Sequence, residues 1–152
     1  GVNTHRANRI VEHALNNKLI NEFKLIKSIK AEFKYSQDTR FDFLCDNKIL
    51  EVKNVTLLRD NKVAEFPDAV TSRGSKHLKM LINSMKKGYK PYVLFLTQIQ
   101  NINKFKIAKD IDANYYKDYI EAKKAGVNFI AYRCYLSSKE IKIEKKINII
   151  DE

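Results

Sequence analysis

The sequence predicts an α/β fold in which helices flank a mixed sheet. Three observations predict it: helix-like and strand-like segments alternate along the chain, one strand-like run is apolar almost throughout, and capping residues and glycines bound the helical segments. No internal repeat, low-complexity tract or linker interrupts the 152 residues. We therefore predict a single domain over residues 1–152, which is long enough to bury a sizeable core.

The first expected elements are a helix, a strand and a hairpin. Thr4 can cap a helix whose apolar positions follow the i, i+3, i+4, i+7 spacing, namely Ala7, Ile10, Val11, Ala14 and Leu15. Residues 28–35 alternate between polar and apolar side chains, as a half-buried strand does. Residues 40–55 then form two alternating strands, and Asp46-Asn47 between them suits a tight turn.

A second helix and a central strand are expected next. Phe66-Pro67-Asp68 opens a helical region and Gly88 stops it. The buried stripe of this helix is Leu78, Leu81, Ile82 and Met85. Residues 92–98 are apolar almost without interruption, which is typical of a strand that is covered on both faces.

The last expected elements are a helix and two strands. Asp112 can cap the helix and Gly126 can end it. Residues 127–136 and 140–150 follow as strands. The resulting order, α-β-β-β-α-β-α-β-β, implies a mixed sheet with helices on its faces.

The composition favours a polyanionic partner. Lys and Arg number 29 against 18 Asp and Glu, which gives a formal net charge of +11. Nucleic acid is the first candidate for such a partner, and a lysine-rich solvated surface is the alternative. Cys45 and Cys134 stand at core positions of strand-like runs, so we expect buried free thiols in a reducing, cytoplasmic compartment.

Other function classes lose support from what the sequence lacks. No apolar stretch approaches the length of a membrane span and no signal-peptide pattern opens the chain, so no membrane partner is expected. The sequence has no Gly-rich phosphate loop and no nucleophile elbow. We therefore expect neither a small-molecule cofactor nor serine-hydrolase chemistry.

The expected hairpin brings two acidic residues together. With the turn placed as above, Asp42 faces Glu51 on the neighbouring strand, and Lys53 projects from the same face. Two carboxylates so placed repel each other unless a positive charge lies between them. Together with a lysine they form a constellation typical of metal-dependent phosphodiester hydrolysis. A solvated acidic pair balanced by Lys53 and Arg40 is the alternative interpretation.

The second helical region carries a row of basic residues. Helical spacing places Arg73, Lys76 and His77 along one side, opposite the apolar stripe, as candidates to contact phosphates. A solvated helix face is the alternative. Gly74 favours a contact, because a mid-helix glycine costs about 1 kcal/mol relative to alanine and usually marks close approach of a backbone or ligand. On the first helix, Glu12 is either a further acidic ligand or the partner of a nearby cation.

Several motifs along the chain resemble the sugar fermentation stimulation protein A (SfsA) family. They are Gly-Val-Asn-Thr-His at residues 1–5, Asn-Arg-Ile-Val-Glu at 8–12, Arg-Phe-Asp-Phe-Leu at 40–44, Glu-Val-Lys-Asn-Val-Thr at 51–56, Phe-Pro-Asp-Ala-Val-Thr at 66–71 with Arg-Gly and Lys-His-Leu at 73–74 and 76–78, and Gly-Val at 126–127 leading into Ala-Tyr-Arg-Cys at 131–134. The resemblance implies a restriction-endonuclease-like fold of the PD-(D/E)XK group. It also implies that Asp42, Glu51 and Lys53 match the active-site residues and that Glu12 matches an acidic residue on the first helix.

The resemblance also carries expectations about the rest of the protein. Family members are described as DNA-binding proteins and regarded as regulators of sugar (maltose) metabolism. They usually carry a small OB-like domain ahead of the segment at residues 1–5, and this domain is absent from the present sequence. The chain also departs from the family pattern, with Ser-Arg-Gly-Ser at residues 72–75 for the usual Glu-Arg-Gly-Gln and Thr39 where serine is common.

These expectations combine into one chemical hypothesis. Asp42 and Glu51, with the carbonyl of Val52, hold Mg²⁺ or Mn²⁺, which are hard ions that prefer oxygen ligands. Lys53 orients the attacking water and offsets charge in the transition state. Glu12 binds a second ion or one of the waters.

The basic residues then contact DNA. We expect Arg73, Lys76 and His77, with Arg40, to bind the backbone without reading bases. The hypothesis is thus a DNA-binding domain with a nuclease-type metal site. Such a domain could act as a Mg²⁺-dependent DNA nuclease. A DNA-binding regulator that does not cut, and a protein-interaction module with a basic surface, are the alternatives.

Overall fold

The computed structural model describes residues 4–60 and 62–151, which form a mixed α/β fold. The helices in these residues are α1 (Thr4–Asn16), the 3-10 helix η1 (Asn21–Phe23), α2 (Ser72–Met85) and α3 (Ala113–Ala125). The strands are β1 (Lys30–Ser36), β2 (Thr39–Cys45), β3 (Lys48–Val55), β4 (Leu57–Asp60), β5 (Val63–Phe66), β6 (Lys90–Thr97), β7 (Lys104–Ile107), β8 (Asn128–Leu136) and β9 (Ile141–Ile149). The predicted class, a mixed sheet flanked by helices, is confirmed.

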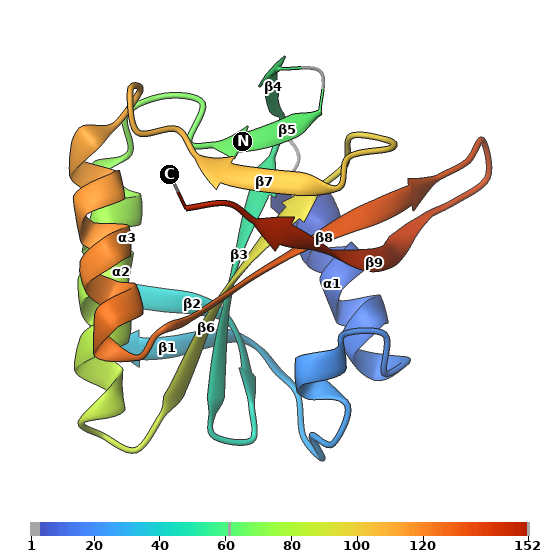
Figure 1. The fold of residues 1–152 in the computed structure, drawn as a ribbon. Helices are drawn as coiled ribbons and strands as arrows, with labels where there is room; N and C mark the ends of the chain where they lie inside the picture. The colour runs from blue at the N-terminus through green and yellow to red at the C-terminus, as the bar shows by residue number, and fades with distance from the viewer. Residues whose placement is uncertain (1–3, 61, 152) are drawn as a thin grey trace.

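The nine strands of the described residues join into one large, strongly curved sheet in the order β1-β2-β3-β6-β8-β9-β7-β5-β4 (Figure 1). Its centre is parallel, because β6 pairs with β3 on one side and with β8 on the other. Antiparallel pairs lie outside this centre: β1 with β2, β2 with β3, β8 with β9 and β4 with β5. Further parallel pairs join β9 to β7 and β7 to β5, so the sheet is mixed along its whole width.

The helices cover the two faces of the sheet. In Figure 1, α2 and α3 lie side by side against one face, and α1 lies on the other side of the central strands. One buried cluster joins α1 to the sheet through residues such as Val11, Phe43 and Leu94. A second cluster, which includes Leu78 and Tyr119, joins α2 and α3 to the opposite face. Two packed layers on a shared sheet thus form the core.

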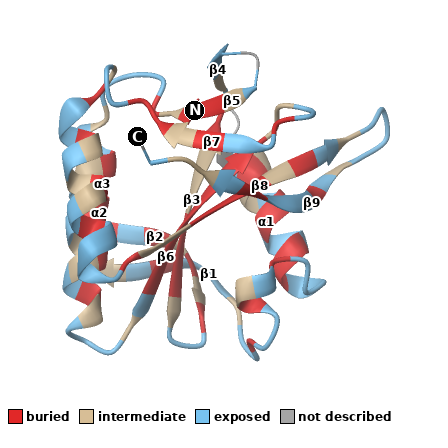
Figure 2. Ribbon diagram, in the orientation of Figure 1, coloured by how far each residue is buried: buried red, intermediate tan, exposed pale blue. Residues whose placement is uncertain are grey.

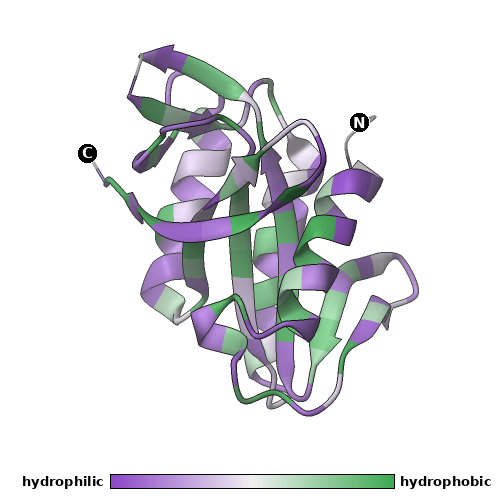
Figure 3. Cartoon of the chain, turned by 90° about the vertical axis from the view of Figure 1, so that its right-hand side faces the viewer, coloured by the Kyte–Doolittle hydropathy of each residue, from purple (hydrophilic) through white to green (hydrophobic). Residues whose placement is uncertain are grey.

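Strand β6 fills the middle of the sheet, as its sequence predicts. Residues 91–97 are all buried, and Figure 2 shows buried residues gathered in the central strands and on the inward sides of the helices. Figure 3 shows the hydrophobic residues concentrated in the same strands. Cys45 and Cys134 are buried and unpaired, as predicted. Among residues 4–60 and 62–151, no helix is both long enough and apolar enough to span a bilayer.

The helix boundaries confirm the predicted capping residues of α3 and correct the predicted start of α2. Asp112 caps α3 by accepting from the backbone N–H of Tyr115, and Gly126 ends the helix at a φ of 117°, both as predicted. Helix α2 begins at Ser72 rather than at Phe66, because Phe66 ends β5 and the Thr71 side chain supplies the cap. The predicted cap at Thr4 lies outside the described side chains.

Gly74 allows α2 and α3 to pack closely. A Cβ atom added at Gly74 would stand 2.9 Å from the Oγ1 of Thr71 and 3.0 Å from a ring carbon of Tyr115 on α3. Both distances are too short for an ordinary carbon contact. Gly74 lies in the first turn of α2 and not in mid-helix as predicted, and its lack of a side chain is explained by the close approach of Thr71 and Tyr115.

The hairpin of β2 and β3 has the register that the sequence predicts. Its ladder pairs Cys45 with Lys48 and Phe43 with Leu50, and Asp46 occupies the turn at a φ of 54°. The ladder ends at Phe43, however, and the residues before it diverge. Phe43 packs in the cluster on the α1 side, whereas Phe41 packs in the cluster on the α2 side. Strand β2 thus separates from β3 at Asp42, and this separation creates the candidate site.

Candidate functional site

Asp42 lies where β2 leaves β3. Its Oδ2 accepts a hydrogen bond of 2.7 Å from the backbone N–H of Val52, and its Oδ1 accepts one of 2.9 Å from the Nδ2 of Asn8 on α1. The carboxylate thus takes the place of the strand carbonyl that would otherwise pair with Val52. This arrangement fixes Asp42 between the first helix and β3.

Glu51 stands beside Asp42 and is 4% exposed. Its Oε2 lies 2.5 Å from the Nδ1 of His77 on α2 and 3.4 Å from the Nζ of Lys53. Alternation along β3 puts Glu51 and Lys53 on one face, and α2 packs over that face with His77 pointing inward. A buried acid is therefore held by two basic side chains from two different elements.

The environment of Asp42 favours its protonated form. Burial raises the pKa of Asp42 from 3.8 to about 7, and the charge of Glu51 and the hydrogen bond between the two carboxyl groups act in the same direction. The hydrogen bonds from Val52 and Asn8 act against this change without overcoming it. Near pH 7 Asp42 is therefore only partly ionised, and the proton that the pair retains lies on Asp42.

The pKa of Glu51, in contrast, is lowered. Burial alone raises its pKa, but the hydrogen bond with His77, the charge of Lys53 and the hydrogen bond with Asp42 outweigh burial and lower the pKa to about 2. Glu51 is therefore the anion of the pair. Because an ionised carboxylate only accepts hydrogen bonds, the proton in the contact with His77 lies on Nδ1.

The two acids open into a cleft of about 730 Å³. Its walls come from α1, β1, β2, β3 and α2, and the cleft is lined by His5, Asn8, Arg9, Glu12, Ala31, Glu32, Arg40, Phe41, Asp42, Phe43, Glu51, Val52, Lys53, Asn54, Phe66, Arg73 and His77. All four predicted acid and lysine positions therefore face one cavity. Basic side chains stand at its exposed margin, with Arg40 on β2 and Arg73 on α2 both exposed.

The predicted residues are not all in contact. Asp42, Glu51 and Lys53 form one group, and Val52 joins it through its backbone N–H. Glu12 lines the same cleft and is exposed, and its neighbour one turn earlier, Asn8, makes the contact with Asp42. The role predicted for Glu12 stays a prediction.

The basic row on α2 divides into exposed and buried members. Arg73 and Lys76 are exposed, and Lys76 pairs with Asp38 at 3.1 Å. His77 is 6% exposed and bonds to Glu51, so it does not lie on the exposed face with the other two. His77 holds the acid in place, and its predicted contact with nucleic acid is not tested by this geometry.

The sequence analysis did not assign Asn8 to the site and did not predict that His77 is buried. Asn8 could have been found from its position one turn before Glu12 on the same helix face. The burial of His77 had a signal too, because Gly74, His77 and Leu81 follow the i, i+3, i+7 spacing of a buried stripe. Because Arg73 and Lys76 are basic and exposed, His77 was grouped with them instead of with the buried stripe.

Few groups in the structure could bind a metal ion. Within residues 4–60 and 62–151, no cluster contains three or more His, Cys, Asp or Glu side chains arranged to hold one. In this described part of the chain, Asp42 and Glu51 are therefore a pair of oxygen donors without a third His, Cys, Asp or Glu ligand. Any ion between them would take further ligands from backbone, water or substrate.

Comparisons with known proteins point to one family. Residues 5–140 match the model of the sugar fermentation stimulation protein RE domain. A curated protein of Pelagibacter ubique, named sugar fermentation stimulation protein homolog, is 62% identical over 155 residues, which cover 99% of this chain and 67% of the relative. A protein of the same name from Brucella anthropi is 38% identical over 154 residues, or 98% of this chain and 66% of the relative.

A solved structure agrees with these sequence relatives. The structure of SfsA from Pyrococcus furiosus in complex with Ca²⁺ matches this fold with a TM-score of 0.87 at 27% identity. The match covers 97% of this chain and 65% of the Pyrococcus chain. The chain thus spans about two thirds of the length of the proteins that it matches.

Proposed function

This chain belongs to the sugar fermentation stimulation protein family, and from that membership we propose that it is a divalent-metal-dependent nuclease domain of the PD-(D/E)XK type that hydrolyses phosphodiester bonds in DNA. One observation carries the proposal. Asp42 and Glu51, two acids that share a proton, lie at the base of a cleft with Lys53 beside them and arginines at its margin. A like-charge pair in this setting suits a cation better than it suits a structural role.

A divalent ion fits the donors that the chain offers. Replacing the shared proton by a metal ion removes the repulsion between Asp42 and Glu51, and carboxylate oxygens suit hard ions. Two carboxylates plus water and phosphate oxygens are the usual way in which proteins bind Mg²⁺. The Pyrococcus furiosus relative, whose structure was determined with Ca²⁺, supports a divalent ion for this family member as well.

The metal ion would polarise the scissile phosphate and lower the pKa of the attacking water. Lys53 lies 3.4 Å from Glu51 and can donate to that water and to the charge that develops on the phosphate. His77 keeps Glu51 ionised and fixes its orientation by donating from Nδ1. Asn8, on the first helix, orients Asp42 by donating from Nδ2 to its Oδ1.

The cleft margin would hold the nucleic acid through its backbone. Arg40 and Arg73 are exposed and face the same cavity as the acids, so both can reach phosphates on a strand that lies in the cleft. The net charge of +11 supports the same kind of partner. Contacts of this kind position a substrate without reading its sequence, so we propose a nuclease with little base preference.

Cleavage assays test the proposal directly. Labelled linear, nicked and single-stranded DNA are incubated with the chain and Mg²⁺ or Mn²⁺, or with EDTA. Lys53→Ala is compared with Lys30→Ala, a control at an exposed position that does not line the cleft. We expect cutting that needs the metal ion, disappears with Lys53→Ala and persists with Lys30→Ala.

The opposite result identifies the alternative function. DNA binding that weakens steeply with salt, without cutting under any metal condition, would contradict the nuclease proposal and favour a regulator that only binds DNA. Because about a third of each relative lies outside the matched region, the same assay is repeated with a full-length relative, such as the Pelagibacter ubique protein. Absence of cutting by both proteins decides against catalysis.

A further inference from the structure

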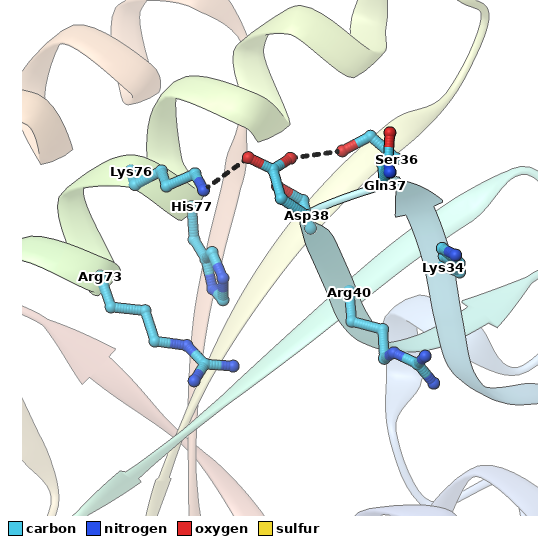
Figure 4. A pocket seen from close by; sticks show the side chains of 9 residues that line it. Lys34, Ser36, Gln37, Asp38, Arg40, Arg73, Lys76 and His77 are labelled. Atoms are coloured by element: carbon cyan, nitrogen blue, oxygen red, sulfur yellow. Dashed lines mark hydrogen bonds and ion pairs between the residues drawn. The ribbon is translucent and has the colours of Figure 1, made fainter.

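A second hollow, distinct from the cleft, lies between the β1–β2 turn and the start of α2. It has a volume of about 400 Å³ and is lined by Lys34, Ser36, Gln37, Asp38, Thr39, Arg40, Arg73, Lys76 and His77. We refer to it as the turn pocket. Figure 4 shows Arg73 and Lys76 extending from α2 on one side, and Asp38 and Arg40 on the other. Three of its residues, Arg40, Arg73 and His77, also line the cleft, so the two hollows share a wall.

The turn pocket carries an excess of positive charge. Four cationic side chains line it against a single carboxylate, that of Asp38. Asp38 pairs with Lys76 at 3.1 Å and accepts a further bond of 3.2 Å from the Oγ of Ser36. Within the described part of the chain, Lys34, Arg40 and Arg73 have no ion pair. Unbalanced cations around a concave surface favour an anionic ligand.

From the excess of positive charge around this hollow we infer that the turn pocket binds a phosphate monoester at the end of a nucleic-acid strand. A monoester carries between one and two negative charges near neutral pH, which matches an excess of several cations better than the single charge of a backbone diester. The shared wall places this phosphate next to the strand that the cleft would hold. Only the nucleic-acid part of the inference rests on the proposed function, because anion binding needs no metal ion.

The inference requires that a strand end be preferred over a strand interior. Binding of short single-stranded oligonucleotides is measured in EDTA with a 5′-phosphate, with a 3′-phosphate, and with hydroxyl groups at both ends. Inorganic phosphate alone is titrated in parallel. We expect one phosphorylated end to bind about tenfold tighter than the hydroxyl ends, which corresponds to one additional charge-assisted contact. Equal affinities would overturn the inference, and so would binding of inorganic phosphate without any preference for a phosphorylated end.

Variants that touch only the turn pocket locate the effect. Lys34→Gln removes a cation that does not line the cleft, and Lys30→Gln removes one from the same strand outside both hollows. We expect Lys34→Gln to abolish most of the preference for the phosphorylated end and Lys30→Gln to keep it. Equal loss with both variants would show that only the overall charge of the protein matters, and would contradict a specific binding pocket.

The two proposals fail in different ways. If the chain does not cut DNA but prefers a phosphorylated end in EDTA, the nuclease proposal is wrong and the turn pocket stands. If the chain cuts DNA with no dependence on terminal phosphate and no effect of Lys34→Gln, the turn pocket is wrong and the nuclease proposal stands.

Discussion

Two buried glutamates on strands of the same sheet, Glu51 on β3 and Glu65 on β5, have opposite surroundings. Glu65 is 3% exposed and receives two hydrogen bonds from Arg59, of 3.1 Å from Nε and 2.5 Å from Nη2. The same guanidinium also pairs with Asp110 in the segment after β7, so one arginine joins the β4–β5 hairpin to a second acid. Glu51 is 4% exposed but stands beside another acid, Asp42, and opens into a cleft.

The contrast separates a structural acid from a functional one. Around Glu65 the network satisfies the buried charge within the protein, so that nothing from outside is needed. Around Glu51 the chain retains a repulsive neighbour that an apolar or amide side chain would have avoided. Repulsion of this kind is retained where a cation, absent from the protein itself, removes it.

The largest expected difference is in catalysis. We expect Glu51→Gln to lower the rate of metal-dependent DNA cleavage by at least about 1,000-fold, because a ligand and its charge are lost together. Glu65→Gln should keep cleavage within a few-fold of the parent once circular dichroism shows that it is folded. Comparable losses with both glutamines would remove the distinction between the two acids.

A second, smaller effect is expected at Lys53. Lys53→Met keeps the length of the side chain but not its charge, and should lower the cleavage rate about 100-fold while leaving metal binding unchanged. The cleavage rate and the metal-induced shift in melting temperature are measured on the same preparation. Loss of the metal-induced shift in melting temperature would mean that Lys53 is needed for metal binding, and would contradict a role in the cleavage step alone.

In the metal-free protein, a substitution in the acid pair should raise the stability, whereas one in the network around Glu65 should lower it. Asp42→Asn removes the like-charge contact and should raise the free energy of unfolding by roughly 1–3 kcal/mol near pH 8 in EDTA. Arg59→Met leaves Glu65 buried without its partner and should lower the melting temperature by several degrees. Destabilisation by both substitutions, measured by chemical denaturation, would contradict the interpretation of Asp42.

The effect of Asp42→Asn should depend on pH. The pKa of Asp42 is raised in the folded protein, so its contribution to stability is present below the unfolded value of 3.8 and is lost as pH rises through about 7. The stability gained by Asp42→Asn should therefore grow between about pH 5 and pH 8. Glu51, whose pKa is lowered, contributes stability that is lost only as pH falls toward about 2, outside this range. A difference that stays constant with pH would show that Asp42 is already ionised at pH 5.

Much of the fold follows from local sequence signals. Asp46-Asn47 and the alternation around it predicted the register of Phe43 with Leu50, and Asp112 and Gly126 predicted both ends of α3. The predictions missed η1, β4, β5 and β7, which are three or four residues long. Strands this short carry too little alternation to detect, and β5 and β7 are recognised only through their parallel pairing with each other.

The site was predictable in its composition but not in its geometry. The residue types of Asp42, Glu51 and Lys53 and their spacing indicated the pair and its lysine. The separation of β2 from β3 could not be predicted, because it depends on Asp42 bonding to the backbone of β3 in place of the strand ladder. The contact between His77 and Glu51 joins residues 26 positions apart and arises only when α2 packs on the sheet.

Calorimetric titration of Mn²⁺ tests the central claim most directly, because it measures cation binding at the acid pair without requiring a substrate. The parent, Asp42→Asn and Glu65→Gln are titrated at one pH and one ionic strength. The account predicts saturable binding by the parent, at least about tenfold weaker binding by Asp42→Asn, and no change with Glu65→Gln. Equal affinity in the parent and in Asp42→Asn would contradict it.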